Sequence, residues 1–295
     1  MILGENIGSV YSTGRGIKKV YSYGKLVWEW KKNDDIDYSL IPFTVKAIDD
    51  AVSVYLKYPF NATGQPIKYS INEGEWIEDI SRYSIDSSGK SYAGIIINLT
   101  KNDTVSILTT ESISQCIITG LSDVYGNIMS LLYSDDFIGK FNWKYMYNGN
   151  GYGFFEKSDI VNANNLVLPA TQLKEYGYDY MFKNCYNLIT APELPAKSML
   201  AYCYRGMFEN CYNLITAPEL PATSVPYAYS YSGMFRGCSK LNYIKCYATN
   251  ISSTAVSNWL NGVNANGTLV CKQVNGGKNP LEDYIPSTWT VEYMD

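Results

Sequence analysis

Histidine is absent from the 295 residues of this chain. Its absence removes the side chain best suited to proton transfer at neutral pH, the usual base beside a serine or cysteine nucleophile, and the commonest transition-metal ligand. A pair of carboxylates can hydrolyse glycosides without histidine, so an enzyme is not excluded on this ground alone. The composition favours a binding or structural role, and we expect no catalytic residue, no cofactor and no metal site.

The chain also lacks a basic block and a long apolar run. Its 24 Lys and Arg residues against 28 Asp and Glu residues give a net charge of −4, which argues against a nucleic-acid partner. No stretch reaches the ~18 consecutive apolar residues of a membrane helix, and residues 1–30 contain no apolar core of a signal peptide. We therefore expect neither membrane insertion nor export by the standard secretory route.

The seven cysteines contain no Cys-x-x-Cys motif and are odd in number. Cys185, Cys211 and Cys238 lie 26 and 27 residues apart, so they occupy one position of a repeat. Disulfides or metal ligands are the alternatives, but the odd count and the spacing fit neither well. We interpret these cysteines as small buried hydrophobic residues.

An internal repeat dominates the second half of the chain. The decapeptide Asn187–Ala196 recurs without change as Asn213–Ala222, and Met-Phe-x-x-Cys begins at Met181, Met207 and Met234. Such self-similarity at a fixed period is the signature of a repeat architecture. Because one unit cannot bury its apolar side alone, successive units must stack into a solenoid.

Each repeat divides into two parts by its pattern. Tyr204, Phe208 and Cys211 follow the spacing i, i+4, i+7, which predicts one face of a short helix. Leu188–Leu194 predicts an extended segment that ends at Pro195, because proline cannot continue a central strand. A short helix and a short strand in each unit are typical of a leucine-rich repeat.

The repeat motif Met-Phe-x-x-Cys-x-x-Leu-x-x-Ala-Pro-x-Leu-Pro-Ala resembles the BspA-like (Treponema-type) leucine-rich repeats of Bacteroidetes and their phages. Residues 252–272, with Trp259 and Leu260 on an expected helix and residues 267–270 on an expected strand, resemble the final repeat that caps these solenoids. Residues 285–291 are similar to the terminal strand that follows it. The resemblance implies a fold more than an activity, because repeat scaffolds serve many partners.

The front half lacks the 26-residue period. Its short β-rich stretches, among them residues 51–56, 67–71, 94–99 and 105–108, are separated by turn signals rich in Asn and Gly. The sequence therefore predicts an N-terminal antiparallel β-sandwich followed by a short leucine-rich-repeat solenoid. The expected segments are a hairpin and linker over 1–41, the sandwich over 42–140, the solenoid with its cap over 141–272, and a terminal strand or tail over 273–295.

The N-terminal segment predicts a β-hairpin over Ile17–Glu29, with its turn at residues 23–25. It resembles the short opening module of many phage tail and virion proteins, which attaches the rest of the chain to a larger assembly. The alternative is an edge hairpin of the sandwich. The candidate anchor residues are Val20, Tyr21, Leu26, Val27 and Trp28.

Tyrosine is abundant, with 28 residues, and two sets of three tyrosines recur with the repeat. Tyr178, Tyr204 and Tyr231 share the face of Phe and Cys, so they are expected in the core. A second set could be exposed as a rigid, amphipathic contact surface for protein or glycan, or could pack between stacked units. This candidate partner-binding set is Tyr176, Tyr202 and Tyr229.

Glu193 and Glu219 fall at the same repeat position, so we expect them side by side on adjacent turns, ~5 Å apart. That spacing suits a retaining glycosidase. Duplication alone explains it, however, and a catalytic pair also needs a concave site that separates the two pKa values. We interpret both residues as part of a solvated face that can contact a partner.

These observations predict a non-enzymatic phage virion protein, a fibre, decoration or tail-associated subunit that mediates assembly or attachment to the bacterial surface. Its expected location is the virion, and its expected partners are other virion proteins or a protein or glycan of the bacterial surface. The first alternative is a bacterial cell-surface adhesin of the same repeat family, and the second is a carbohydrate-active enzyme. A homo-oligomer is possible, but no heptad or self-complementary patch requires one.

Overall fold

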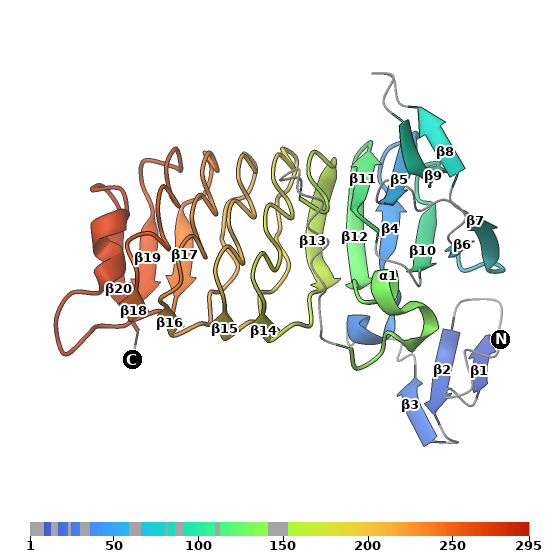
Figure 1. Ribbon diagram of the computed structural model, residues 1–295, viewed down its shortest axis with the longest axis horizontal. Helices are drawn as coiled ribbons and strands as arrows, with labels where there is room; N and C mark the ends of the chain where they lie inside the picture. The colour runs from blue at the N-terminus through green and yellow to red at the C-terminus, as the bar shows by residue number, and fades with distance from the viewer. Residues whose placement is uncertain are drawn as a thin grey trace.

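The structure, a computed structural model, describes residues 9–12, 17–22, 25–29, 36–58, 66–80, 82–85, 91–109, 113–140 and 153–294. The fold is mostly β, with a β-solenoid of about 5 turns that follows the strands of the front half (Figure 1). Helix is scarce in the described ranges. It comprises one short α-helix, α1 (Ser130–Tyr133), and three 3-10 segments, η1 (Tyr38–Leu40), η2 (Ser134–Asp136) and η3 (Pro280–Tyr284).

The first three strands form a small antiparallel sheet of their own. They are β1 (Ser9–Ser12), β2 (Ile17–Ser22) and β3 (Lys25–Glu29). The predicted hairpin is confirmed, because Val20 pairs with Trp28 and Tyr21 with Leu26. The side chains of these strands lie outside the described part of the chain, so the anchor role remains a prediction.

Two larger sheets occupy the front half. One has six strands in the order β13-β12-β4-β10-β6-β7, and the other has four in the order β11-β5-β9-β8. Their bounds are β4 (Thr44–Ala47), β5 (Val52–Tyr58), β6 (Pro66–Ile71), β7 (Ile77–Ile80), β8 (Arg82–Ile85), β9 (Ser91–Leu99), β10 (Thr104–Thr109), β11 (Gln115–Thr119), β12 (Ser122–Asn127) and β13 (Ile160–Val167).

Buried and partly exposed residues alternate along β5, so one face of its sheet packs against a core. In β5, residues 52, 54, 56 and 58 are buried and the residues between them are partly exposed. This pattern is typical of a sheet with one face on the core and the other in water. The two sheets are what the structure establishes here, and a separate β-sandwich over 42–140 is not confirmed.

The larger sheet continues into the solenoid. β12 pairs antiparallel with β4 on one side and parallel with β13 on the other, and β13 belongs to the first solenoid turn. Backbone hydrogen bonds therefore cross the expected boundary at residue 140. Since every turn of a solenoid needs a neighbour to cover its edge, β12 provides that neighbour for the first turn.

Each solenoid turn has three sides. The strand side carries the parallel strands β13, β17 (Tyr243–Cys246), β19 (Thr268–Cys271) and β20 (Thr290–Tyr293), with extended segments 187–194 and 213–220 in the turns between. A second side carries the two-residue strands β14 (Gln172–Leu173), β15 (Ser198–Met199), β16 (Ser224–Val225) and β18 (Asn250–Ile251). The third side, here called the turn side, comprises residues 176–186, 202–212, 229–239 and 254–263. Figure 1 shows these turns stacked along the long axis.

The predicted helix on each repeat is wrong, because the turn side is a chain of tight turns. In the second repeat, Tyr202, Gly206 and Asn210 all have φ near +60° (62, 55 and 62), a left-handed conformation that interrupts any helix every fourth residue. Trp259 and Leu260 likewise lie in turns and not on a helix. A chain of four-residue turns places residues i, i+4 and i+7 on one side much as a helix does, so the spacing alone could not separate the two structures.

Backbone hydrogen bonds of the turn side alternate between two kinds of partner. The N–H groups of Met207 and Glu209 bond three residues back, to Tyr204 and Gly206. Phe208 N–H, which lies between them, bonds to the carbonyl of Met234 on the next turn at 2.9 Å. Half of these donors therefore close local turns and half hold neighbouring turns together.

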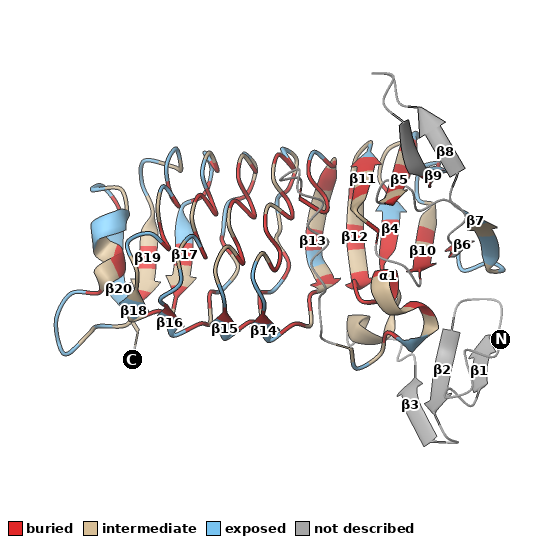
Figure 2. Cartoon of the chain, in the orientation of Figure 1, coloured by how far each residue is buried: buried red, intermediate tan, exposed pale blue. Residues whose placement is uncertain are grey.

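This register aligns like side chains in columns, and Figure 2 shows buried segments of the chain recurring from turn to turn along the solenoid. Phe155, Phe182, Phe208 and Phe235 stack with ring centroids 5.3, 5.6 and 5.7 Å apart. Met181, Met207 and Met234 are buried, and their carbonyls accept bonds from the phenylalanine N–H groups of the preceding turns. The predicted stacking of repeats along one axis is confirmed.

The cysteines belong to this core, as predicted. All seven are free and buried. The thiols of Cys185, Cys211 and Cys238 donate to the carbonyls of Phe155, Phe182 and Phe208 on the preceding turns, at 3.1, 3.1 and 3.0 Å. Burial raises the pKa of these thiols, so they remain protonated donors at neutral pH.

The C-terminal end closes the turn side with two tryptophans. Trp259 Nε1 donates to the Tyr284 carbonyl and Trp289 Nε1 to the Asn264 carbonyl, each at 2.8 Å. Asn279 caps η3 and also donates to the Ala248 carbonyl. The expected strands at residues 267–270 and 285–291 are present as β19 and β20, the second of them shifted to Thr290–Tyr293.

In the described ranges, no helix has the length and apolar character required to span a lipid bilayer.

Two glycines of the turn side provide a matched test of the turn geometry. Gly233 and Gly237 have φ of +61° and +78°; a Cβ at Gly233 would meet nothing within 4 Å, whereas one at Gly237 would lie 2.3 Å from Asn210 Oδ1. Gly233→Ala should cost about 1–2 kcal/mol for the left-handed backbone. Gly237→Ala should cost at least about 1 kcal/mol more, because it displaces a hydrogen-bonded amide. Urea denaturation of both variants measures this difference.

The Asn210→Ala background is the control for that prediction. Removing the amide removes the contact, so the difference between the two glycine variants should shrink. Equal losses in the native background would contradict the turn geometry described here.

Candidate functional site

The candidate tyrosines form a stacked column on the turn side. The Tyr176 and Tyr202 ring centroids are 4.7 Å apart at an interplanar angle of 6°, and those of Tyr202 and Tyr229 are 5.1 Å apart at 12°. Tyr229 is 40% exposed, and the other two are half-buried. The ring faces pack between turns, as one interpretation expected, and the role of the column as a contact surface for a partner stays a prediction.

The backbone fixes the position of these tyrosines. Tyr176, Tyr202 and Tyr229 have φ of 62°, 62° and 61°, and each N–H donates to a carbonyl of the following turn. Tyrosine rarely adopts this left-handed conformation, so the surrounding hydrogen bonds must impose it. The backbone of the solenoid consequently fixes the positions of the three rings.

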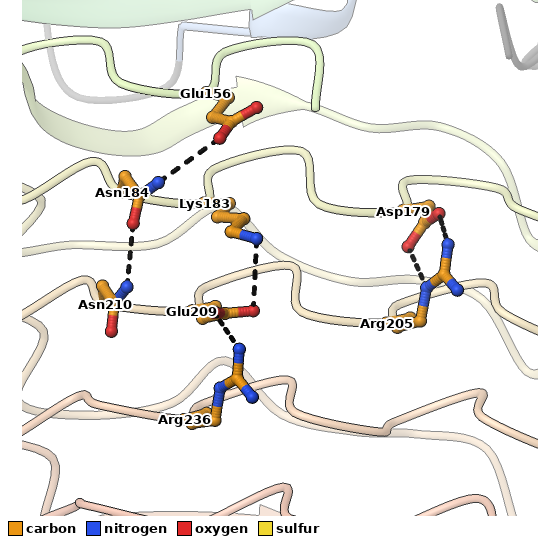
Figure 3. A network of polar contacts seen from close by, with 8 residues as sticks. All are labelled: Glu156, Asp179, Lys183, Asn184, Arg205, Glu209, Asn210 and Arg236. Atoms are coloured by element: carbon orange, nitrogen blue, oxygen red, sulfur yellow. Dashed lines mark hydrogen bonds and ion pairs between the residues drawn. The ribbon is translucent and has the colours of Figure 1, made fainter. Parts of the chain in front are cut away.

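Arg205 links the column to a buried carboxylate. Its guanidinium lies 4.7 Å from the Tyr202 ring centroid and 4.9 Å from that of Tyr180. Arg205 Nε and Nη2 donate to the two carboxylate oxygens of Asp179 at 3.0 and 2.6 Å (Figure 3). This bidentate pairing holds the guanidinium within the distance of the rings at which cation–π attraction acts.

Asp179 is almost fully buried, at 1% exposure. Burial raises its pKa to about 6, although the Arg205 hydrogen bonds and charge act in the opposite direction. The carboxylate therefore depends on Arg205 to remain charged at neutral pH.

A second polar network runs beside the phenylalanine column. The residue after each phenylalanine alternates in charge, in the order Glu156, Lys183, Glu209 and Arg236. Lys183 Nζ lies 3.7 Å from Glu209 Oε2, and Arg236 Nη2 pairs with Glu209 Oε1 (Figure 3). Sequence reasoning missed this network, although its signal, the residue that follows each repeat phenylalanine, was available.

Amides complete the network. Asn210 donates to Asn184 Oδ1 at 2.8 Å, and Asn184 donates to Glu156 Oε1 at 3.3 Å. Glu156 is 5% exposed, and burial raises the pKa of its carboxyl. The hydrogen bonds from Asn210 through Asn184 to Glu156 connect three turns of the turn side.

The tyrosines expected in the core are there. Tyr178, Tyr204 and Tyr231 are each 1% exposed, with ring centroids 6.1 and 6.0 Å apart. Their burial leaves the other column as the accessible one.

The two glutamates lie on the strand side, away from the tyrosine column. Glu219 pairs with Lys245 at 2.7 Å and accepts a hydrogen bond from Tyr247 at 3.3 Å, whereas Glu193 is exposed. The cation, Lys245, lies on the solenoid turn that follows Glu219, at the equivalent position of the strand side. Both glutamates face solvent, as the interpretation of a solvated face required.

Another exposed stripe was missed. Tyr186 and Tyr212 stack at 5.2 Å and are 45% and 44% exposed, with Ile189 and Ile215 exposed beside them. The signal was the identity between repeats, which begins at Asn184 and Asn210 and so includes both tyrosines. This stripe lies at the corner between the turn side and the strand side.

Within the part of the chain that the structure describes, no group of three or more Cys, Asp or Glu side chains could hold a metal ion. Searches against family models, curated proteins and solved structures find no match to this chain. The arrangement of its own residues therefore carries the functional argument.

Asp179 generates a prediction on pH dependence. Its folded-state pKa of about 6 lies above the ordinary value of 3.8, so the folded protein holds this proton more tightly than the unfolded chain does. The associated stability is present below pH ~4 and is lost as the pH rises through ~6. Relative to Asp179→Asn, the free energy of unfolding of the native protein should fall by more than about 1 kcal/mol across this window.

Denaturation at a series of pH values tests this, with Asp50→Asn as the control at an exposed carboxylate. A parallel profile for Asp179→Asn would show that this carboxyl does not titrate as described.

Proposed function

We propose that this chain is a non-enzymatic structural protein of a phage virion, a fibre, decoration or tail-associated subunit that mediates assembly or attachment to the bacterial surface. The observation that carries the proposal is the column of Tyr176, Tyr202 and Tyr229, stacked within about 5 Å of one another and accessible along the solenoid. Tyrosine supplies large amphipathic contact area at low cost in conformational entropy. A partner meets a surface that is already ordered.

The polar contacts around the column support the same role. Arg205 is held by buried Asp179, and the alternating charges from Glu156 to Arg236 join adjacent turns. These contacts reduce the ordering that binding would otherwise require, which is the general route from rigidity to affinity. In the proposed role, the column contacts a neighbouring virion protein or the bacterial surface.

The N-terminal strands support the location in a virion. The paired strands β2 and β3 and the resemblance of residues 17–29 to virion attachment modules suit a chain tethered at its N-terminal end. With that tether on the particle, the solenoid would project toward the partner.

Mass spectrometry of purified particles tests the location. Particles of a phage that encodes the chain should yield its peptides at a fixed ratio to the major capsid protein through successive purification steps. Absence of these peptides from infectious particles would reject the virion role.

Tyr229→Ala tests the contact surface. Particles that carry this variant should adsorb to the bacterial host about tenfold more slowly, because an exposed aromatic anchor is lost. Tyr212→Ala is the matched control, since Tyr212 is 44% exposed and stacked on one ring, but lies at the other corner. If both variants and the native phage adsorbed at the same rate, the tyrosine column would not be part of the surface that binds the host.

A further inference from the structure

The turn side separates its charges by depth. Within the residues that define it, the acidic residues Asp179 and Glu209 are 1% and 5% exposed. The basic residues Lys183, Arg205 and Arg236 are half-buried or exposed. A ligand that approaches these described residues therefore meets three cations and no accessible carboxylate, although the whole chain has a net charge of −4.

Charged residues that adjoin the turn side do not reverse this sign. Lys174 and Glu175, just before the tyrosine column, are both exposed and offset each other. Lys157 and Lys240 are also exposed. Asp159 is half-buried and accepts hydrogen bonds from a backbone N–H and an amide at 3.0 and 3.1 Å. The charge that this region presents to a ligand is therefore positive.

Buried carboxylates hold the cations without using all of their donors. Asp179 accepts two N–H groups of Arg205, at 3.0 and 2.6 Å, out of the five that a guanidinium carries. Glu209 pairs with two cations at once, Lys183 and Arg236 (Figure 3). Two positive charges beside one carboxylate leave an excess of positive charge, and the Arg236 side chain is 49% exposed. An anionic group can therefore bind to cations whose positions are already fixed.

Aromatic rings adjoin the same cations. Lys183 Nζ lies 4.4 Å from the Tyr180 ring centroid. The Arg205 guanidinium lies 4.9 Å from the Tyr180 centroid and 4.7 Å from that of Tyr202. Arg205 thus joins Tyr180 to the tyrosine column, and rings and cations form one continuous surface.

One position on this surface is open. A Cβ at Gly206 would lie 2.3 Å from the Tyr180 ring, so this ring covers the Gly206 backbone. Gly206 is the equivalent of Tyr180 one turn on, and Gly233 follows at the same position of the next turn. Because Gly206 has no side chain to cover Gly233, a Cβ at Gly233 would meet nothing within 4 Å. A ring supplied by a ligand can lie over Gly233 as the Tyr180 ring lies over Gly206.

We infer that the turn side binds an acidic polysaccharide. Its carboxylate or phosphate groups pair with Lys183, Arg205 and Arg236, and one of its sugar rings lies over Gly233, four residues after the exposed Tyr229. A linear polymer suits a surface on which cations and rings recur over successive turns. The inference rests on the proposed function, because it names the chemistry that the tyrosine column and its cations would contact on the bacterial surface.

Two other polyanions fit this surface less well. The net negative charge of the chain disfavours a nucleic acid, whose many phosphates would be repelled. An acidic peptide carries its charges on Asp and Glu side chains, which contain no ring to occupy the open position at Gly233. Both serve as comparisons in the experiment.

Isothermal titration calorimetry of the full chain with defined polymers tests the inference. Polygalacturonate supplies carboxylates and a phosphomannan supplies phosphates, and at least one of them should bind. Dextran, a neutral polysaccharide, should not bind. Salt at ~1 M, which screens charges beyond ~3 Å, should weaken binding of the acidic polymer by about tenfold or more.

The polymers also separate the outcomes. Binding of polygalacturonate alone assigns the carboxylate as the recognised anion, and binding of phosphomannan alone assigns the phosphate. No binding of either, or equal binding of dextran, would overturn the inference. Poly(glutamate) or single-stranded DNA bound as tightly as the acidic polysaccharide would overturn it as well.

Arg236→Gln tests the cations. The variant should bind the acidic polysaccharide about tenfold more weakly, and Arg236→Lys, which keeps the charge, should lose less. Lys197→Gln is the matched control, because Lys197 is an exposed cation of the solenoid just before β15, outside the turn side. Native affinity of Arg236→Gln, or an equal loss in Lys197→Gln, would contradict the inference.

Gly233→Asn tests the open position. Asparagine tolerates the left-handed backbone, and its side chain would occupy the place of the sugar ring, so binding should weaken about tenfold. Gly276→Asn is the control: Gly276 has φ of +73°, its Cβ would also meet nothing within 4 Å, and it lies in the loop after β19. Equal affinities of these two variants would show that no sugar ring lies over Gly233.

Thermal denaturation checks that each variant is folded. The measurements use the purified chain and not the particle, so they separate this inference from the proposed function. Slower adsorption of Tyr229→Ala phage, together with no binding of the acidic polymers, would retain the attachment role and reject this ligand.

Discussion

The structure depends on how the turn side divides its backbone hydrogen bonds. Every second N–H closes a local turn, and every other one reaches the carbonyl of the adjacent turn, as Met207 and Phe208 do. A helix would use all of these donors internally and would leave none to join the repeats. The left-handed residues at Tyr202, Gly206 and Asn210 make this division possible, because they reset the chain direction every fourth residue. Backbone hydrogen bonds therefore stack the turns, and the side-chain columns follow from that stacking.

Once the backbone sets the register, equal positions must stack, and the consequences differ by residue type. Aromatic rings gain from parallel stacking, so Phe182 and Phe208 repeat without conflict. Charges of one sign would repel at this spacing, and the column that passes through Lys183 and Glu209 alternates accordingly. On the strand side Lys245 pairs with Glu219, while Glu193 and Glu219, which carry the same charge at one repeat position, are both exposed to solvent. Accessible and buried tyrosine columns arise from the same repetition and differ only in which side of the chain they face.

Much of this could be predicted from the repeat itself. The stacking axis, the burial of Cys185 and its equivalents, and the core position of Tyr204 followed from period and residue type. The helix could not be distinguished from tight turns, because both structures bring residues i, i+4 and i+7 to one side. The column that includes Tyr229 was identified as a candidate, but the pairing of Arg205 with Asp179 was not, since these two residues belong to different turns and meet only when the turns stack.

The sequence alone determined that this chain repeats a 26-residue unit and which residues of the unit avoid water, because period and hydrophobicity are local properties that survive in any register. Only the tertiary structure decided that the unit is built from turns, that β12 covers the first turn, and that β20 pairs in parallel with β19. Those features depend on which backbone groups find partners across 25 or more residues of chain. Only the geometry of neighbouring turns determines which backbone N–H and C=O groups pair.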